Sequence, residues 1–114
     1  MGKTAIILGA TGLTGSILLQ KLLADTNYKA IKLFSRSPSN VMSSKIVEFI
    51  VDLHHPASFS DDFTADEVFC CIGTTAAKTN EKEQYKAIDF GIPLGAATLA
   101  KQNGIPSFIV VSAM

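Results

Sequence analysis

The chain has no tryptophan, only two cysteines and no excess of charge of either sign. Ten Lys and Arg residues balance ten Asp and Glu residues, so the sequence lacks the basic excess by which proteins bind nucleic acids or anionic membrane surfaces. No apolar run approaches the roughly 18 residues that a membrane-spanning helix needs. We therefore expect a partner that is neither a nucleic acid nor a membrane.

The two cysteines, Cys70 and Cys71, are adjacent. Neighbouring residues on a strand point to opposite faces, so these thiols cannot easily bridge each other or hold a metal ion together. No basic residue lies nearby in the sequence to activate a thiol, and we expect two small core residues rather than nucleophiles. A reducing, cytoplasmic setting fits this cysteine content best.

The length and the apolar content predict one folded domain over residues 1–114. The chain is 47% hydrophobic and 18% charged, which excludes an intrinsically disordered protein. Short, β-branched apolar runs predict strands at residues 5–8, 30–34, 46–51, 68–72 and 108–111. Because these runs are nearly continuous rather than alternating, they are typical of a parallel sheet that is covered on both faces. The sequence therefore predicts an α/β fold.

The first two predicted strands are joined by an amphipathic helix over residues 13–24, which makes one βαβ unit. A second helical region ends near Gln102, but Gly91 and Pro93 interrupt it, so we expect a new helix to begin near Asp89 as N-cap. Gly104 is expected just beyond its end. Residues 53–62 are either a loop or a short helix.

A glycine-rich turn joins the first strand to the first helix, with Gly9, Gly12 and Gly15 in the spacing G-x-x-G-x-x-G. In this context, Gly9 permits a tight turn, Gly12 lets the backbone approach a pyrophosphate, and Gly15 lets the helix pack closely on the strand. The helix N-terminus then offers free N–H groups to the phosphates. The alternative is a glycine turn needed for packing alone. A nucleotide-triphosphatase loop is excluded, because no Gly-Lys-Ser/Thr is present.

Two further strand ends carry candidate contacts to a dinucleotide. Arg36 stands where proteins that prefer NAD place an acid, and its guanidinium suits a 2′-phosphate, unless it is a solvated loop residue. Asp52 could accept a hydrogen bond from the adenine amino group with Leu53 packing on the ring, or Asp52 could cap the next turn. NADP is therefore the expected cofactor, ahead of NAD.

The fourth and fifth predicted strands end with small and hydroxyl-bearing residues. Ile72, Gly73 and Thr74 suit a backbone that passes close to the second ribose, and Ser112 is the candidate catalytic hydroxyl. The pair Tyr28 and Lys32 has the Tyr-x-x-x-Lys spacing of a reductase, but it leads into a strand, where these positions are about 13 Å apart. We therefore reject it as a catalytic pair.

In these motifs and in their order the chain resembles the atypical short-chain dehydrogenases/reductases, most of all the Tat-interacting-protein-like group of NAD(P)H-binding proteins. The resemblance implies a Rossmann-like, doubly wound parallel sheet, a preference for NADPH, and a Ser-Tyr-Lys catalytic set whose Tyr and Lys lie beyond the last residue. It assigns the pyrophosphate to Gly9, Thr11, Gly12, Leu13, Thr14 and Gly15, the 2′-phosphate to Arg36, the adenine to Asp52 and Leu53, the second ribose to Ile72, Gly73 and Thr74, and the catalytic-strand serine to Ser112.

The chain stops directly after the fifth predicted strand, so we expect the N-terminal part of a longer domain. Its predicted function is to bind NADP(H) in an oxidoreductase that acts on a small carbonyl substrate, and the fragment alone should be inactive. The alternative is a non-catalytic NADP(H)-sensing or interaction domain of the NmrA-like kind. In the expected strand order 3-2-1-4-5, the fifth strand is an open apolar edge through which a homodimer could form.

Overall fold

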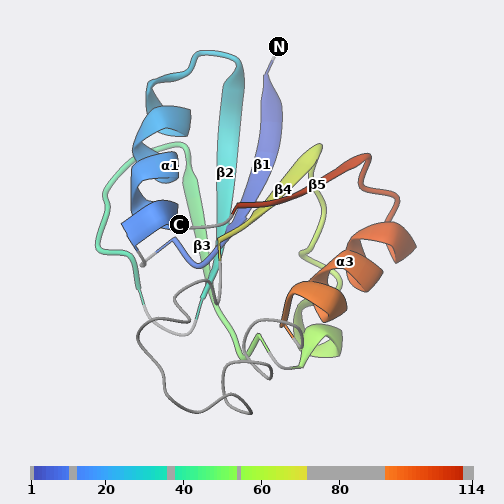
Figure 1. The fold of residues 1–114 in the computed structure, drawn as a ribbon. Coiled ribbons are helices and arrows are strands. Elements are labelled where there is room, and N and C mark those ends of the chain that lie inside the picture. Colours follow the sequence, from blue (N-terminus) through green and yellow to red (C-terminus); the bar gives the residue numbers. More distant parts are fainter. Residues whose placement is uncertain (1, 11–12, 36–37, 54, 72–91, 112–114) are drawn as a thin grey trace.

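The computed structural model describes residues 2–10, 13–35, 38–53, 55–71 and 92–111, which form a parallel sheet flanked by helices (Figure 1). The strands are β1 (Lys3–Leu8), β2 (Tyr28–Ser35), β3 (Ile46–Ile50), β4 (Glu67–Cys70) and β5 (Ser107–Val110), and the helices are α1 (Leu13–Ala24), the 3₁₀ helix η1 (Pro56–Phe59) and α3 (Ile92–Gln102). The strand order is β3-β2-β1-β4-β5, with every neighbouring pair parallel. The predicted Rossmann-like α/β fold is therefore confirmed.

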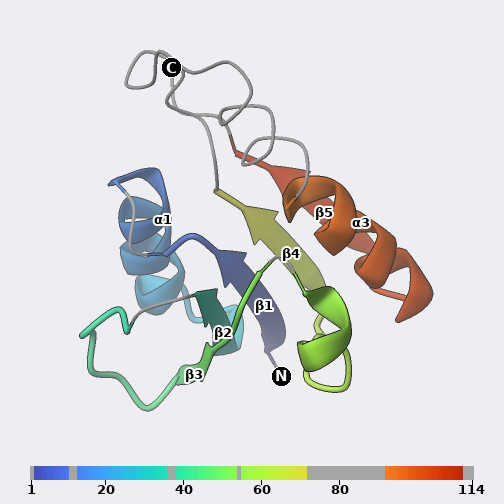
Figure 2. The same cartoon turned by 90° about the horizontal axis from the view of Figure 1, so that it is seen from below.

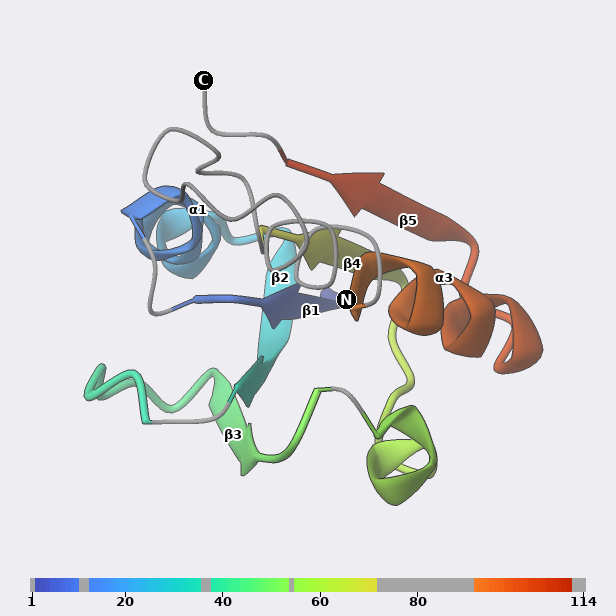
Figure 3. The ribbon, with the colours of Figure 1, turned by 60° about the horizontal axis from the view of Figure 1, so that its bottom comes forward.

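The sheet separates two apolar cores. Helix α1 packs on one face, and η1 with α3 packs on the other (Figures 2 and 3). The central strand β1 alternates between these cores: Ala5 and Ile7 belong to the α1 side, Ile6 and Leu8 to the α3 side, and all four are 0% exposed. Burial on both faces explains why the apolar run in β1 is continuous.

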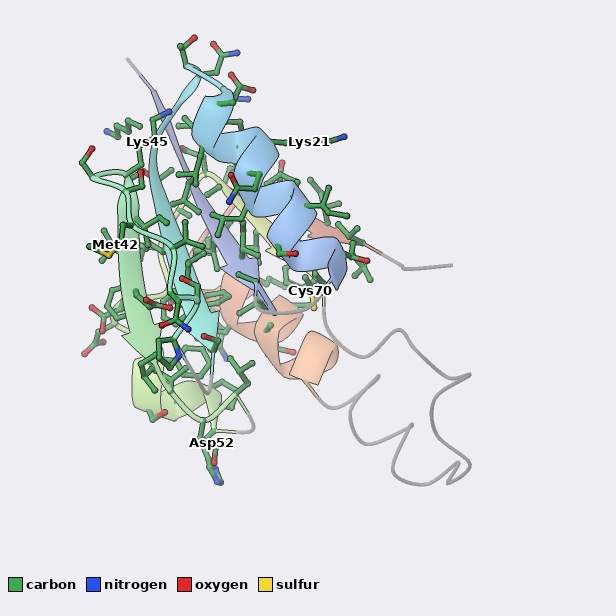
Figure 4. The ribbon with its side chains drawn as sticks, turned by 90° about the vertical axis from the view of Figure 1, so that its left-hand side faces the viewer. Lys21, Met42, Lys45, Asp52 and Cys70 are labelled. Atoms are coloured by element: carbon green, nitrogen blue, oxygen red, sulfur yellow. The ribbon has the colours of Figure 1, made fainter. Side chains whose placement is uncertain are left out.

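Helix α1 has the predicted bounds and buries Leu19 and Leu22 against the sheet. Its C-terminal end is held by a lysine from the segment before β3. The ammonium group of Lys45 donates hydrogen bonds to the carbonyl oxygens of Leu23 and Asp25, each at 3.1 Å (Figure 4). A cation placed on the last carbonyls satisfies unpaired acceptors and interacts favourably with the negative end of the helix dipole.

Four phenylalanines form the aromatic part of the core on the α3 side. Phe34 stacks on Phe49 with ring centroids 4.7 Å apart, and Phe59 and Phe63 each lie 5.3 Å from Phe34. Helix η1 brings Phe59 into this group, so the stretch whose structure the sequence left open contains a short helix. It lies between β3 and β4 in the sequence and packs against α3.

Helix α3 begins at Ile92, so that Pro93 occupies its first turn, where the missing N–H costs least. The predicted N-cap, Asp89, lies outside the described residues. At the other end, Gly104 has φ +72° and the Ile105 N–H bonds back to the Ala100 carbonyl at 2.9 Å, which is a Schellman end of the helix. Within the described residues, no helix has the length and apolar content to cross a membrane.

Candidate functional site

The candidate site begins at the turn between β1 and α1, at the carboxyl end of the central strand. Gly9 has φ +84°, a backbone conformation that side chains rarely adopt. Gly15, in the first turn of α1, packs directly on Gly9: a Cβ added at Gly15 would overlap the Gly9 carbonyl oxygen and lie 2.9 Å from the Cα of Ala10. The turn and the close packing predicted for these two glycines are therefore present, and they draw the start of α1 up to the end of β1.

The first turn of α1 contains no acidic residue. Its leading N–H groups have no partners inside the helix, and no carboxylate within that turn offsets the positive end of the helix dipole. Leu13 and Thr14, which the sequence assigns to the pyrophosphate, are the first two helical residues. An anionic group placed at the carboxyl end of β1 would therefore face the positive end of the helix dipole.

The end of β2 is held rigidly against β3. The Ser35 side chain is buried, and its carbonyl accepts a hydrogen bond from the Val51 N–H at 2.8 Å. After the three residues that follow, the chain is bound to the sheet again, because the Ser39 N–H donates to Oε2 of Glu48 on β3 at 2.6 Å. Sequence reasoning missed Glu48; the signal that could have found it is a single charged residue inside an otherwise apolar edge strand.

Past the end of β3, Asp52 and Leu53 lie in different environments. The Asp52 carboxylate is half exposed at the carboxyl edge of the sheet (Figure 4), with Oδ2 3.5 Å from Nε2 of His55. The Leu53 side chain is 8% exposed and belongs to the core with Phe59 and Phe63. Asp52 is therefore accessible to a ligand, whereas Leu53 mainly supports the base of this edge.

At the end of β4, the two cysteines face opposite cores, as expected from their adjacency. Cys70 belongs to the α3 side and Cys71 to the α1 side, and neither forms a disulfide. Burial, followed by the neighbouring Cys70, raises the pKa of Cys71 to about 11. The raised pKa keeps the Cys71 thiol protonated at neutral pH. Both cysteines are buried, so their predicted place in the core is confirmed.

The rejected pair Tyr28 and Lys32 has no shared role in the structure. The Tyr28 hydroxyl donates to Oε1 of Glu67 at 2.5 Å. The Lys32 ammonium group instead donates to the Thr64 carbonyl at 2.8 Å and to its hydroxyl at 2.9 Å. The remaining predicted site residues lie outside the described part of the chain; they are Thr11, Gly12, Arg36, Ile72, Gly73, Thr74 and Ser112.

A pocket of about 380 Å³ lies between η1 and α3. Its lining includes Pro56, Ser60, Thr98 and Gln102 and none of the residues that the sequence assigns to a cofactor. We therefore place the candidate site at the carboxyl edge of the sheet rather than in this pocket.

Comparison with known proteins identifies the family to which the chain belongs. The model of a family described as NAD(P)H-binding matches residues 9–114. Protein FMP52-1, mitochondrial, from Scheffersomyces stipitis is 35% identical over 96% of this chain, and Protein HTATIP2 from Rattus norvegicus is 29% identical over 96% of it. This chain covers 50% and 47% of those two proteins, so it spans about half the length of the curated relatives that it matches.

Two solved structures share the fold. A mutant of uronate dehydrogenase from Agrobacterium tumefaciens, complexed with NAD, has a TM-score of 0.81 at 17% identity, covering 99% of this chain and 42% of that one. WbmG from Bordetella bronchiseptica, also in complex with NAD, has a TM-score of 0.77 at 14% identity, covering 96% and 37%. Given the family match over residues 9–114, this chain belongs to the NAD(P)H-binding family, among the atypical short-chain dehydrogenases/reductases.

Proposed function

We propose that this chain binds NADP(H), with the turn between β1 and α1 holding the pyrophosphate. The observation that carries the proposal is the packing of Gly15 on Gly9, which brings the start of α1, where N–H groups lack partners within the helix, to the carboxyl end of β1. A pyrophosphate needs this combination of backbone donors and a positive helix end. Gly12 would then lie against the phosphates, where a side chain would exclude them.

The proposed preference for NADPH over NADH rests on Arg36. This residue directly follows the buried end of β2, and neither neighbour, Ser35 nor Ser37, is acidic. A guanidinium at this position can form two charge-assisted hydrogen bonds to a 2′-phosphate, whereas an acid would bind the ribose hydroxyls of NAD and repel the phosphate. The half-exposed carboxylate of Asp52 would accept a hydrogen bond from the adenine amino group. Ile72, Gly73 and Thr74 would line the second ribose.

The test is calorimetric titration of the purified chain with NADPH and with NADH. Tighter binding of NADPH is expected, and Arg36→Asp should reverse the order, because losing the charge-assisted contact costs about ten- to a hundredfold in affinity. Lys101→Asp, on the exposed end of α3, is the matched control and should leave the order unchanged. Equal affinities of the unmutated chain for the two nucleotides would contradict the proposal.

As the reaction we propose hydride transfer between NADP(H) and a small carbonyl compound, carried out by a longer protein whose cofactor-binding part is this chain. Ser112, two residues beyond β5, would orient the carbonyl oxygen. Proton donation needs a tyrosine with a nearby lysine, and here Tyr28 and Lys32 are each engaged elsewhere. The 114-residue chain alone should therefore consume no NADPH with a panel of aldehydes and ketones, and measurable turnover would refute this assignment.

As a further partner we propose a second copy of the chain, paired through the edge of β5. Ile109 is 41% and Val110 is 58% exposed, and β5 carries no charged residue. The opposite edge strand, β3, has Glu48 at its centre, and a charge inside an edge strand opposes pairing with another copy. Two β5 edges can therefore add to each other across a two-fold axis without bringing like charges together.

The cytoplasm is the location that we propose, because both cysteines are buried and neither takes part in a disulfide. The relatives from Scheffersomyces stipitis and Candida albicans are named mitochondrial proteins. Fluorescence microscopy of the tagged chain beside a mitochondrial marker distinguishes the two compartments, and overlap with the marker would refute the proposal.

A further inference from the structure

We propose that Glu48 is a positioning residue for nucleotide selectivity, acting on the chain just beyond Arg36. The inference rests on the proposed function, since it concerns how the 2′-phosphate is recognised. Its basis is the bond in which Oε2 of Glu48 accepts the Ser39 N–H at 2.6 Å. A hydrogen bond from a backbone amide to a carboxylate is charge-assisted and about twice as strong as one between neutral groups.

Both ends of the stretch that contains Arg36 are tied to the same edge of the sheet. Before it, the Ser35 carbonyl accepts a hydrogen bond at 2.8 Å from the N–H of Val51, the residue directly after β3. Beyond it, Ser39 is bound by Glu48 in the middle of β3. Only three residues separate these two anchors in the sequence. The first anchor is a backbone bond that any sequence could form, so the side chain of Glu48 is the sequence-specific one.

The segment after Ser39 depends on the same anchor. The Ser39 hydroxyl accepts the Val41 N–H at 3.3 Å, and Asn40 between them has φ +62°, so the chain turns sharply at this point. Glu48 itself is exposed and belongs to neither apolar core. Its carboxylate therefore contributes to the position of the loop between β2 and β3 rather than to the packing of the sheet.

An effect through Arg36 predicts selectivity rather than a general loss of binding. NADPH and NADH share their pyrophosphate, adenine and nicotinamide contacts and differ only in the 2′-phosphate. Releasing Ser39 should therefore weaken the binding of NADPH and leave the binding of NADH unchanged. Removing the charge of Glu48 would have the opposite effect if that charge simply repelled the phosphate, because NADPH would then bind more tightly.

The experiment is calorimetric titration of four variants with both nucleotides, alongside thermal unfolding. Glu48→Ala removes the hydrogen-bond acceptor. It should lower the affinity for NADPH by about five- to tenfold and leave the affinity for NADH unchanged within about twofold. Glu48→Asp keeps the charge but is one methylene shorter, and should show a smaller loss of the same kind. Glu48→Gln keeps an acceptor oxygen and should restore most of the selectivity. Glu67→Ala, a strand glutamate that binds Lys3 and Tyr28 instead, is the matched control for stability alone.

Unchanged selectivity in Glu48→Ala, or equal weakening of both nucleotides, would overturn the inference. Tighter NADPH binding in both Glu48→Ala and Glu48→Gln would overturn it as well, since it would mean repulsion by the charge. If Glu48→Ala does not fold, Glu48→Asp decides by the same criterion. Failure of the proposed function is visible separately, because the unmutated chain would then show no preference for NADPH and Arg36→Asp would change nothing.

Discussion

The Gly15 backbone lies against the carbonyl group of Gly9, so closely that even a methyl group at Gly15 would overlap the Gly9 oxygen. Gly9 is the residue at which the chain leaves β1, with φ +84°, and Gly15 stands in the first turn of α1. The contact fixes how closely the helix approaches the strand. It therefore also fixes the gap into which a pyrophosphate would have to fit.

Substituting Gly15→Ala should both destabilise the fold and weaken nucleotide binding. The added carbon meets backbone atoms that cannot rotate away, and overpacking of this kind costs about 1–3 kcal/mol. Gly104→Ala is the control. The φ of +72° at Gly104 is unfavourable for alanine, but nothing lies within 4 Å of the added Cβ. That variant should lose about 1 kcal/mol and bind NADPH normally. Urea unfolding and titration measure both effects, and a Gly15→Ala chain that binds NADPH with full affinity would contradict the steric role.

Lys45→Met should destabilise the chain by about 1 kcal/mol, because it removes the charged donor from the last carbonyls of α1 while keeping most of the side-chain volume. The bonds concerned run from Nζ of Lys45 to Leu23 and Asp25. Lys21→Met is the matched control, since Lys21 lies in the same last turn of the helix but points into solvent (Figure 4). Equal unfolding free energies of the two variants would show that the Lys45 bonds contribute nothing.

The stability of the chain should fall at high pH through Tyr28. The hydrogen bond to Glu67, with smaller contributions from burial and from the charges of Glu67 and Asp25, raises the pKa of Tyr28 from 10.0 to about 12. A group whose pKa is raised by folding stabilises the fold fully below its unfolded pKa. This contribution is therefore lost as the pH rises from 10 towards 12.

The measurement for Tyr28 is urea unfolding of the unmutated chain and of Tyr28→Phe at about pH 8 and about pH 11. The phenylalanine variant should be the less stable one at the lower pH, and the difference between the two chains should shrink at the higher pH. A difference that stays constant or widens would mean that the tyrosine proton does not stabilise the fold.

Pairing through β5 predicts a dimer that a single lysine disrupts. Val110→Lys places a charge on the open edge strand and should give a monomer in sedimentation equilibrium over a dilution series. Met42→Lys, at a residue that is 94% exposed and lies outside the sheet, is the control and should leave the dimer intact. A strictly monomeric unmutated chain would refute the edge argument.

The sequence predicts the sheet and α1 well, because these features are encoded locally, in β-branched runs and in the glycine spacing. The strand ends are less predictable. Strand β1 begins at Lys3 and β2 at Tyr28, outside the apolar runs, because both side chains meet on Glu67 at the start of β4, far away in the chain. A hydrogen-bonded ladder can extend wherever such polar partners support it.

The candidate site was only partly predictable for a similar reason. The turn at Gly9 and the packing of Gly15 follow from glycine chemistry and could be anticipated. The burial of Leu53 depends on Phe59 and Phe63, which η1 and the following loop bring beneath it. The bond from Ser39 to Glu48 joins a loop amide to a side chain nine residues later, so the charge inside β3 marks Glu48 in the sequence but does not identify its partner.

The most direct test of the central claim is to titrate the isotope-labelled chain with NADPH and follow the amide chemical shifts. Saturable changes are expected at the carboxyl edge of the sheet, around Gly9, Thr14 and Gly15 and beside Asp52. Amides at the opposite edge, such as that of Glu67, should not move. No saturable change, or changes gathered around the pocket between η1 and α3, would contradict the account.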